Sequence, residues 1–481
     1  MIFNSLSYLL LLALVVALYW NLPYRARLLL IFGTSLVFYG FWRVEFLPLL
    51  LLSTTIDYVV ARMMEGRPDR QRKRLLLVSL VSNLGLLIYF KYLIFIAENV
   101  TGFAHLLGFE PDPVVLTIIL PLGISFYTFQ TISYTIDVYR GFIRPEKDFI
   151  AYGCYVTFFP QLIAGPVLRA AEVLYQFKDR VPFSWEDVFS GLRRVLYGLL
   201  LKVVVADNIA PLVDSGYATP AESLSALDVH TLAFLFGFQI YFDFSAYSHI
   251  AIGSARMIGI RFPENFNFPY LANSPRDFWR RWHISLSSWI RDYLYLPLAG
   301  IKVQDRSVGG LATATTDRQN NRALFASWCI MGLWHGANWT FLLWGIYHAV
   351  AILCYRMLAP LIRFVPRALQ WVIGVAITLP VMMLGWIPFR AESVHDALLM
   401  WGRLFDPSAY LWLGLRENVY LVTALLTLLV IMMFAVHHWV IPRLSRLPAV
   451  LAIGDMASVA VTTFLALVFL QATNQFIYFQ F

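Results

Sequence analysis

Long apolar runs limit the folds available to this sequence more than any other feature. The chain has 481 residues, of which 59% are hydrophobic and only 14% are charged, and its mean hydropathy is +0.66. A soluble domain carries about 25% charged residues. One chain cannot hide so much apolar surface from water, so its solvent must be a lipid bilayer. Helices satisfy their own backbone polar groups there, which predicts an all-α polytopic membrane protein.

A membrane span needs about 20 apolar residues. The sequence predicts roughly eleven long helices. They are expected near Ile2–Trp20, Leu28–Trp42, Phe46–Val60, Leu75–Ala97, Val114–Val138, Val188–Val205, His230–Ile260, Ala323–Leu353, Trp371–Ile387, Val419–Val436 and Val450–Leu470.

Loop charge predicts the orientation of these spans. Residues 62–74 hold six Lys or Arg and two Asp or Glu, so their net charge is +4, whereas residues 98–112 hold three acidic residues and no Lys or Arg. Positive loops stay in the cytoplasm, so the first loop is expected inside and the second outside, which also puts the N-terminus outside. The total charge of +8 comes from residues that flank apolar spans, so we expect no nucleic-acid partner.

Residues 149–298 do not have the pattern of simple spans. Their apolar stretches are interrupted by prolines and charges, which predicts broken or re-entrant helices buried in protein or lining a watery cavity. Amphipathic helices lying on the inner membrane surface are the alternative. The prolines are Pro160, Pro166, Pro263, Pro269 and Pro275.

His283 is the first of two histidines in unusual positions. Ser274, Pro275 and Asp277 have the pattern of a helix start, with Ser274 as the N-cap. Continuing the helix from there aligns a histidine with a cationic stripe, which suits an anionic ligand such as phosphate groups. An interfacial helix whose arginines face lipid headgroups is the alternative. The stripe consists of Arg276, Arg280, His283, Ser287 and Arg291, and Trp282 lies on the opposite face.

His335 is the second, inside the apolar helix expected over residues 323–353. Asn338 lies at i+3, and a neutral imidazole near an orienting amide is the arrangement that a general base needs. Gly332 and Gly336 would let another backbone pack closely. A buried histidine bonded to a carbonyl is the alternative. His348, on another face of the same helix, is expected to pack without a chemical role.

Three further expectations concern ligands. The candidate substrate- and donor-binding residues are Arg276, Arg280, Arg291, Asn338 and Trp282. Asp243 or His249 could complete a metal site with the two histidines by sequence alone, but we expect no metal and no permanently bound cofactor. Lys91, within the fourth span, is expected to snorkel or to pair with a carboxylate.

Several ordered motifs resemble the membrane-bound O-acyltransferase superfamily, in its bacterial alginate O-acetyltransferase branch. The longest is Phe-Trp-Arg-Arg-Trp-His-Ile-Ser-Leu-Ser, and Gly-Leu-Trp-His-Gly-Ala contains the second histidine. The resemblance runs along the whole chain. The matching segments are residues 278–287, 289–298, 332–337, 241–245, 264–267 and 158–166.

The resemblance implies one membrane domain over residues 1–481. It would form a ring of helices around a thin centre that contains short helices and a tunnel. Residues 1–148 would be the N-terminal spans, residues 149–353 the catalytic core, and residues 354–481 the C-terminal spans with the terminal motif.

The resemblance also implies acyl transfer across a bacterial inner membrane. His335 would be the principal catalytic residue, with His283 as its companion. Acetyl-coenzyme A would be the donor, and a periplasmic or membrane-anchored partner would pass the acetyl group to a polysaccharide. Some relatives serve peptidoglycan or teichoic acids. Transporters and scaffolds of a polysaccharide export complex are the rival classes.

The terminal hexamer, residues 476–481, is similar to one in related transfer systems, where its tyrosine holds the acyl group. That implies a covalent role for Tyr478. An aromatic tail anchored at the membrane interface is the alternative. The chain departs from the family pattern at Ala246 and His249, where Gly and Asp are expected, and in a longer segment over residues 300–322. These departures leave the acceptor open.

Overall fold

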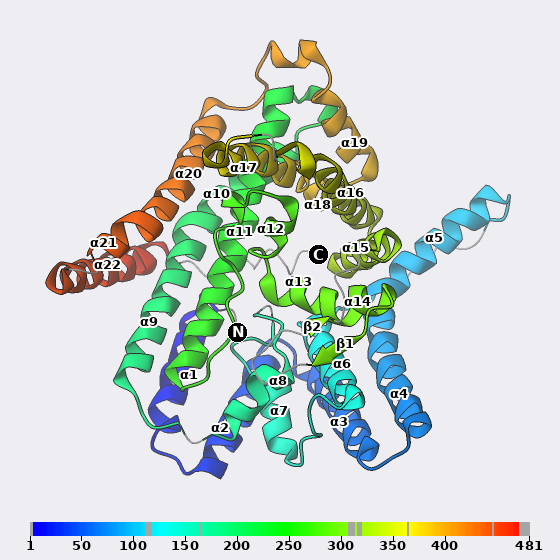
Figure 1. Cartoon of the computed structure of the whole chain (residues 1–481), viewed down its shortest axis with the longest axis vertical. Helices are drawn as coiled ribbons and strands as arrows, with labels where there is room; N and C mark the ends of the chain where they lie inside the picture. Colours follow the sequence, from blue (N-terminus) through cyan, green and yellow to red (C-terminus); the bar gives the residue numbers. More distant parts are fainter. Residues whose placement is uncertain are drawn as a thin grey trace.

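The computed structural model describes residues 3–110, 117–163, 165–179, 181–305, 313–314, 320–362, 365–444 and 447–470. This part of the chain is almost wholly helical, which confirms the predicted all-α membrane class (Figure 1). The strands found there form one short antiparallel ribbon, in which β1 (Val303–Asp305) pairs with β2 (Thr313–Ala314).

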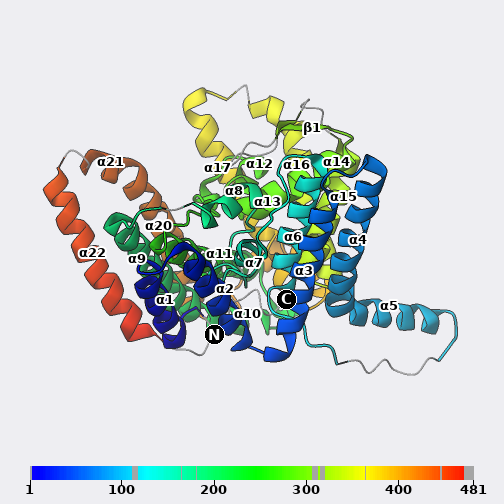
Figure 2. The same cartoon turned by 90° about the horizontal axis from the view of Figure 1, so that it is seen from below.

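The N-terminal helices form a bundle in which α3, α4 and α6 pack against one another. The π-helical turn η2 (Ile88–Tyr92) joins α4 to α5, and α5 then projects away from the bundle (Figures 1 and 2). The elements are α1 (Leu6–Tyr19), α2 (Tyr24–Gly40), η1 (Val44–Phe46), α3 (Leu47–Met64), α4 (Asp69–Leu87), α5 (Leu93–Leu106) and α6 (Ile124–Arg140).

The middle of the chain alternates short helices with three longer ones. Its elements are α7 (Phe149–Thr157), α8 (Ala170–Val173), η3 (Leu174–Phe177), α9 (Trp185–Leu199), η4 (Leu200–Ala206), α10 (Asp207–Tyr217), η5 (Ala221–Ser223), α11 (Ala226–Met257), η6 (Pro269–Leu271), α12 (Pro275–Trp279), α13 (Ile284–Ile290), η7 (Arg291–Tyr295) and α14 (Leu296–Leu298).

The C-terminal helices α17, α19 and α20 pack against α11, and α16 and α17 pack against α12, which lies near the middle of Figure 1. The C-terminal elements are α15 (Asn321–His335), α16 (Trp339–Ile362), α17 (Arg367–Leu384), α18 (Ile387–Arg390), α19 (Val394–Arg403), η8 (Pro407–Tyr410), α20 (Glu417–Ala435), η9 (Val436–Val440), α21 (Ile441–Leu444) and α22 (Pro448–Phe469).

The expected count of about eleven spans is not confirmed. Within the described ranges, six helical stretches are long and apolar enough to cross a bilayer, and two shorter apolar helices accompany them. Two of the other expected spans correspond to helices that are mostly buried in protein, namely the 17-residue α6 and the 32-residue α11. The six are Val44–Met64, Asp69–Leu106, Trp185–Tyr217, Trp339–Ile362, Leu369–Arg390 and Glu417–Arg443.

The broken segments of the middle region are buried in protein, as the first of the two alternatives predicted. Phe158, Phe159 and Leu168 follow the end of α7 and are at most 1% exposed. Their backbone is satisfied from other elements, since the N–H of Phe159 donates to Ser35 Oγ at 3.1 Å. Irregular backbone at this depth is tolerated only with such partners.

Helix α11 forms the buried wall behind the candidate site. It starts at a capping box, in which Ser225 Oγ accepts the N–H of Asp228 and the Asp228 carboxylate accepts the N–H of Ser225. Its close contact with α9 depends on glycine, because a Cβ on Gly253 would lie 2.6 Å from the carbonyl oxygen of Gly191. Phe244 of α11 contacts the His283 ring edge-on at 4.6 Å.

Candidate active site

His283 lies in a break between two short helices, not in one long helix. Ser274 caps α12 as predicted, and its Oγ accepts the N–H of Asp277 at 3.1 Å. The helix then ends at Trp279, and His283 adopts a left-handed conformation with φ 41°. Such a conformation costs a non-glycine residue about 1–3 kcal/mol and recurs at functional sites. The continuous stripe predicted from helical spacing is therefore wrong.

Backbone pairing with a distant segment causes this break. The N–H of Asn267 donates to the Arg281 carbonyl, and the N–H of Ile284 donates to the Asn265 carbonyl, both at 2.9 Å. These two bonds compete with continued helix formation at the same residues. Helical periodicity does not register such partners, because they come from a segment that precedes the helix start.

Asn265 determines which nitrogen of His283 carries the proton. The Asn265 Oδ1 lies 3.1 Å from His283 Nδ1 and also accepts the backbone N–H of Ser285 at 3.3 Å. Because a backbone N–H can only donate, this Oδ1 is an acceptor, so Nδ1 of His283 must be the donor. Its Nε2 then carries the lone pair, and this buried atom has no hydrogen-bond partner in the described part of the chain. A lone pair in this position can take up a proton.

His335 is the last residue of α15, and the single helix expected over residues 323–353 is two helices. The backbone of Gly336 is extended, and α16 starts at Trp339. The glycine pair has the expected role, because a Cβ on Gly332 would overlap the Phe341 carbonyl oxygen of α16. The imidazole is 6% exposed and lies edge-on to Trp344 at 4.9 Å.

The fold brings the two predicted histidines together. His283, His348 and Lys91 all lie within electrostatic range of His335. His348 was expected on another face of a continuous helix, but the break after His335 turns α16 back along α15. Its ring packs against Trp344 at 4.7 Å and Trp279 at 5.0 Å. His348 is thus a neighbour of the candidate site that periodicity missed.

Buried polar atoms without partners gather around these rings. In the described ranges they include the indole nitrogens of Trp279, Trp334 and Trp344 and both ring nitrogens of His348. An unsatisfied buried polar group costs about 1–3 kcal/mol, so folds rarely keep several together without a functional reason. This concentration marks the region around His335 as the candidate active site.

A polar anchor that the sequence did not single out holds the far end of α13. Arg169 and Asp292 are 1% and 0% exposed, and their side chains pair at 2.6 Å. The Arg169 guanidinium also donates to Ser288 Oγ at 2.9 Å. Residue spacing offers no signal for this pair, because 123 residues separate its members. Asp292 and Asn265 both lie in segments that carry the family resemblance, whereas Arg169 does not.

The three candidate donor-binding arginines do not share one helical stripe. Arg276 and Arg280 are exposed, and neither forms an ion pair or hydrogen bond with described residues. Arg291 is half-buried, and its Nε donates to Asp292 at 2.6 Å. Trp282 is buried in the core, where it stacks on Phe278 with ring centroids 5.6 Å apart.

Asn338 lines an open cavity beside the loop that follows His335. Its Oδ1 accepts the N–H of Thr340 at 3.0 Å and so starts α16. The cavity has a volume of about 690 Å³ and lies between this loop and α5, and we call it the α5 groove. Trp339 is half exposed there, and its indole N–H donates to Asn99 at 2.9 Å. Tyr478 lies outside the described residues.

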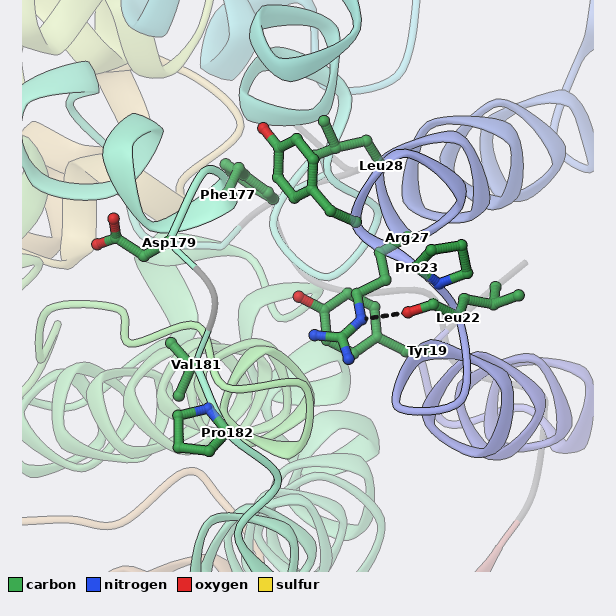
Figure 3. Close-up of a pocket in the computed structure, with 10 residues that line it drawn as sticks. Tyr19, Leu22, Pro23, Arg27, Leu28, Phe177, Asp179, Val181 and Pro182 are labelled. Carbon is green, nitrogen blue, oxygen red and sulfur yellow. Dashed lines mark hydrogen bonds between the residues drawn. The ribbon is translucent and has the colours of Figure 1, made fainter.

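A second cavity, of about 390 Å³, lies between the α1–α2 turn and residues 177–182 (Figure 3). None of the candidate site residues within the described ranges lines it. Among its described lining residues the arginine is Arg27, whose Nε donates to the Leu22 carbonyl at 2.9 Å and whose guanidinium lies over Tyr19 at 4.9 Å. We therefore assign the chemistry to the region around His335.

Asp243 and His249, the candidate further metal ligands, interact with basic residues. The Asp243 carboxylate pairs with Lys202 at 2.7 Å, and His249 Nδ1 accepts from Arg194 at 3.2 Å. In the described ranges, no three His, Cys, Asp or Glu side chains gather as a metal site would require.

Comparison with known proteins gives a family match over the region just described. A model of MBOAT, the membrane-bound O-acyltransferase family, matches residues 144–389, which contain His283 and His335. The chain is similar to the "Probable alginate O-acetylase AlgI" of Azotobacter vinelandii, with 37% identity over 458 residues that cover 93% of this chain and 87% of the relative.

Two further relatives agree with this match. The protein of the same name from Pseudomonas aeruginosa is 39% identical over 412 residues, covering 84% of this chain and 75% of the relative. The "Peptidoglycan O-acetyltransferase" of Helicobacter pylori is 36% identical over 395 residues, covering 76% and 71%. Together with the apolar helices, these matches confirm the resemblance drawn from the motifs: the chain belongs to the membrane-bound O-acyltransferase family and is a multi-pass membrane O-acyltransferase.

Proposed function

We propose that this acyltransferase moves an acetyl group from cytoplasmic acetyl-coenzyme A to an acceptor outside the inner membrane, in the O-acetylation of alginate or a related exopolysaccharide. The names of the relatives from Azotobacter and Pseudomonas support this acceptor class. The observation that carries the proposal is the placement of two buried imidazoles, His283 and His335, within electrostatic range of each other inside the stretch that matches the family.

In the proposed reaction, His335 removes the proton of the acceptor hydroxyl while the hydroxyl oxygen attacks the thioester carbonyl carbon. The new C–O ester bond forms as the C–S bond breaks, and the coenzyme A thiolate leaves and takes the proton. His283 assists through Nε2, the ring nitrogen with the lone pair. Positioned bases of this kind contribute about 10²–10⁴ in rate.

The donor is proposed to bind near the exposed arginines of α12. Arg276 and Arg280 have no ion-pair partner among the described residues, so their guanidinium groups can bind the phosphates of coenzyme A. Arg291 is the third candidate, although its Nε is shared with Asp292. This assignment puts α12 toward the cytoplasm.

The acceptor is proposed to approach through the α5 groove, which starts two residues after His335. The orientation from loop charge puts the acidic residues 98–112, and hence the groove, outside the membrane together with the N-terminus. Among the described residues that line the groove, Glu98 is charged. A carboxylate there repels a polyuronate, which favours delivery through a periplasmic or membrane-anchored partner over direct contact with alginate.

Tyr478 is proposed as a transient acyl carrier. A phenol loses its proton far more readily than a sugar alcohol, and its ester is a more reactive donor, so one difficult transfer becomes two easier ones. The Tyr478→Phe protein should form no acetylated intermediate and little acetylated product. Wild-type product levels would remove this role and leave direct transfer from the thioester.

A second candidate acceptor is the cell wall. The Helicobacter pylori relative is named as a peptidoglycan O-acetyltransferase, which favours peptidoglycan, and its identity to this chain is close to that of the alginate relatives. Acetylation assays with alginate and peptidoglycan fragments offered side by side, each with the partner encoded nearby, would decide between the two.

The central test uses purified protein in lipid nanodiscs with radiolabelled acetyl-coenzyme A. The wild type should release free coenzyme A and pass label to an acceptor, which neither a transporter nor a scaffold would do. His335→Ala should lower turnover by about 10²–10⁴. His395→Ala is the matched control, because His395 is an exposed histidine on α19. Turnover unaffected by the loss of His335 would refute the assignment.

A further inference from the structure

The helix that ends at His335 lacks a backbone cap. The last four carbonyls of any α-helix have no partner within the helix. A left-handed residue after the helix commonly returns backbone N–H groups to them. Here Gly336 is extended, with φ −157° and ψ 149°, and its N–H makes no capping bond. The end of α15 therefore depends on groups from elsewhere in the fold.

Lys91 and Tyr92 supply those groups from η2. Lys91 Nζ donates to the Trp334 carbonyl at 2.6 Å and to the His335 carbonyl at 2.9 Å. The Tyr92 hydroxyl donates to the Leu333 carbonyl at 2.8 Å. Three consecutive carbonyls at the end of α15 are thus bonded by two consecutive side chains. We call Lys91 and Tyr92 the carbonyl clamp.

The π-helical turn explains how both side chains reach one helix end. Residues 88–92 form five residues of π-helix between α4 and α5, a local widening that often occurs at functional sites. Lys91 has neither of the two arrangements that the sequence predicted. It does not snorkel to the surface, and within the described ranges it forms no ion pair. Its amine donates instead to two backbone carbonyls of α15, more than 240 residues away.

The clamp acts on the residue that carries the chemistry. The His335 carbonyl is itself one of its acceptors, so the clamp determines where the backbone of this residue lies. A misplacement of about 1 Å in a reacting group can cost about 10²-fold in rate.

We propose that Lys91 is a positioning residue for His335, acting through the last turn of α15, with Tyr92 as its helper. The inference rests on the proposed function, because it assigns to His335 the proton transfer whose rate would report the positioning. Lys91 itself touches neither donor nor acceptor.

The test compares three substitutions in the nanodisc assay. Lys91→Met removes the donor at similar length and should lower kcat about 10–100-fold with the KM for acetyl-coenzyme A within about twofold. Lys91→Arg keeps donors for both carbonyls and should recover most of the lost kcat. Tyr92→Phe removes one bond and should lower kcat severalfold. Lys178→Met is the control, because the Lys178 side chain is half exposed and its ion-pair partner, Glu146, is not a candidate site residue.

Several outcomes would overturn the positioning role. One is a kcat of Lys91→Met within twofold of the wild type, and another is a higher KM at unchanged kcat. Equal losses in Lys91→Met and Lys91→Arg would also overturn it, because the donors would then be irrelevant. If Lys91→Met does not accumulate as folded protein, Tyr92→Phe decides, and its kcat must fall.

A readout without turnover separates this inference from the proposed function. Diethylpyrocarbonate modifies imidazoles, and peptide mass spectrometry would follow its rate at His335. The rate should change severalfold in Lys91→Met and stay unchanged in Lys178→Met. A wild type that transfers no acetyl group would refute the proposed function, and an unchanged labelling rate in Lys91→Met would refute the clamp.

Discussion

Removal of the Asn265 side chain should lower kcat strongly and lower the free energy of unfolding only moderately. In Asn265→Ala, the N–H of Ser285 loses its acceptor, which costs about 1–3 kcal/mol in a buried site. The lost hydrogen bond of the His283 imidazole costs less free energy, because Ser285 Oγ, 3.4 Å from Nδ1, can accept a hydrogen bond from the Nδ1–H group. The expected loss of unfolding free energy is about 2–4 kcal/mol.

The catalytic loss has a different origin. Without Asn265, neither the tautomer nor the ring orientation of His283 is determined, and orienting partners of this kind are worth about 10–100-fold. Asn265→Asp keeps the acceptor oxygen and should retain more activity than Asn265→Ala. Acetyl transfer and thermal unfolding would be measured together, with Asn208→Ala as control, because the Asn208 amide donates only to the Val203 and Val204 carbonyls of η4 among the described residues. A wild-type kcat in Asn265→Ala would refute the reasoning.

Two further predictions concern the supports of the site. Arg169→Met leaves the buried Asp292 carboxylate without its main partner and should destabilise the protein by about 3–5 kcal/mol, whereas Arg25→Met, at a largely exposed ion pair, should cost less than about 1 kcal/mol. Equal shifts in thermal unfolding would contradict this. Gly332→Ala should force α15 and α16 apart and lower kcat with the melting temperature, because its Cβ would overlap a backbone carbonyl of α16, whereas Gly454→Ala, in open space, should change neither.

A separate prediction concerns the α5 groove. Because the acceptor is proposed to enter beside the exposed Trp339, Trp339→Ala should raise the KM for the acceptor or its partner protein and leave hydrolysis of acetyl-coenzyme A unchanged. An unaltered KM would move the acceptor path elsewhere.

Composition and local pattern were enough for the class of this protein. The apolar runs predicted membrane helices, the Ser274 pattern predicted a helix start, and the ordered motifs around His283 and His335 led to the family that the comparisons confirm. These features are local or additive, so they can be recognised in the sequence without information on tertiary contacts. The same reasoning does not fix the number of spans, because apolar composition does not separate lipid-facing helices from buried ones.

Tertiary structure alone decided how the candidate residues meet. Periodicity extended one helix through His283 and another through His335, but pairing with residues 265–267 breaks the first, and the extended Gly336 ends the second. The partners that orient these histidines, Asn265 and Lys91, come from separate segments. A hydrogen bond between distant residues leaves no periodic trace in sequence, so these contacts appear only when the helices are packed together.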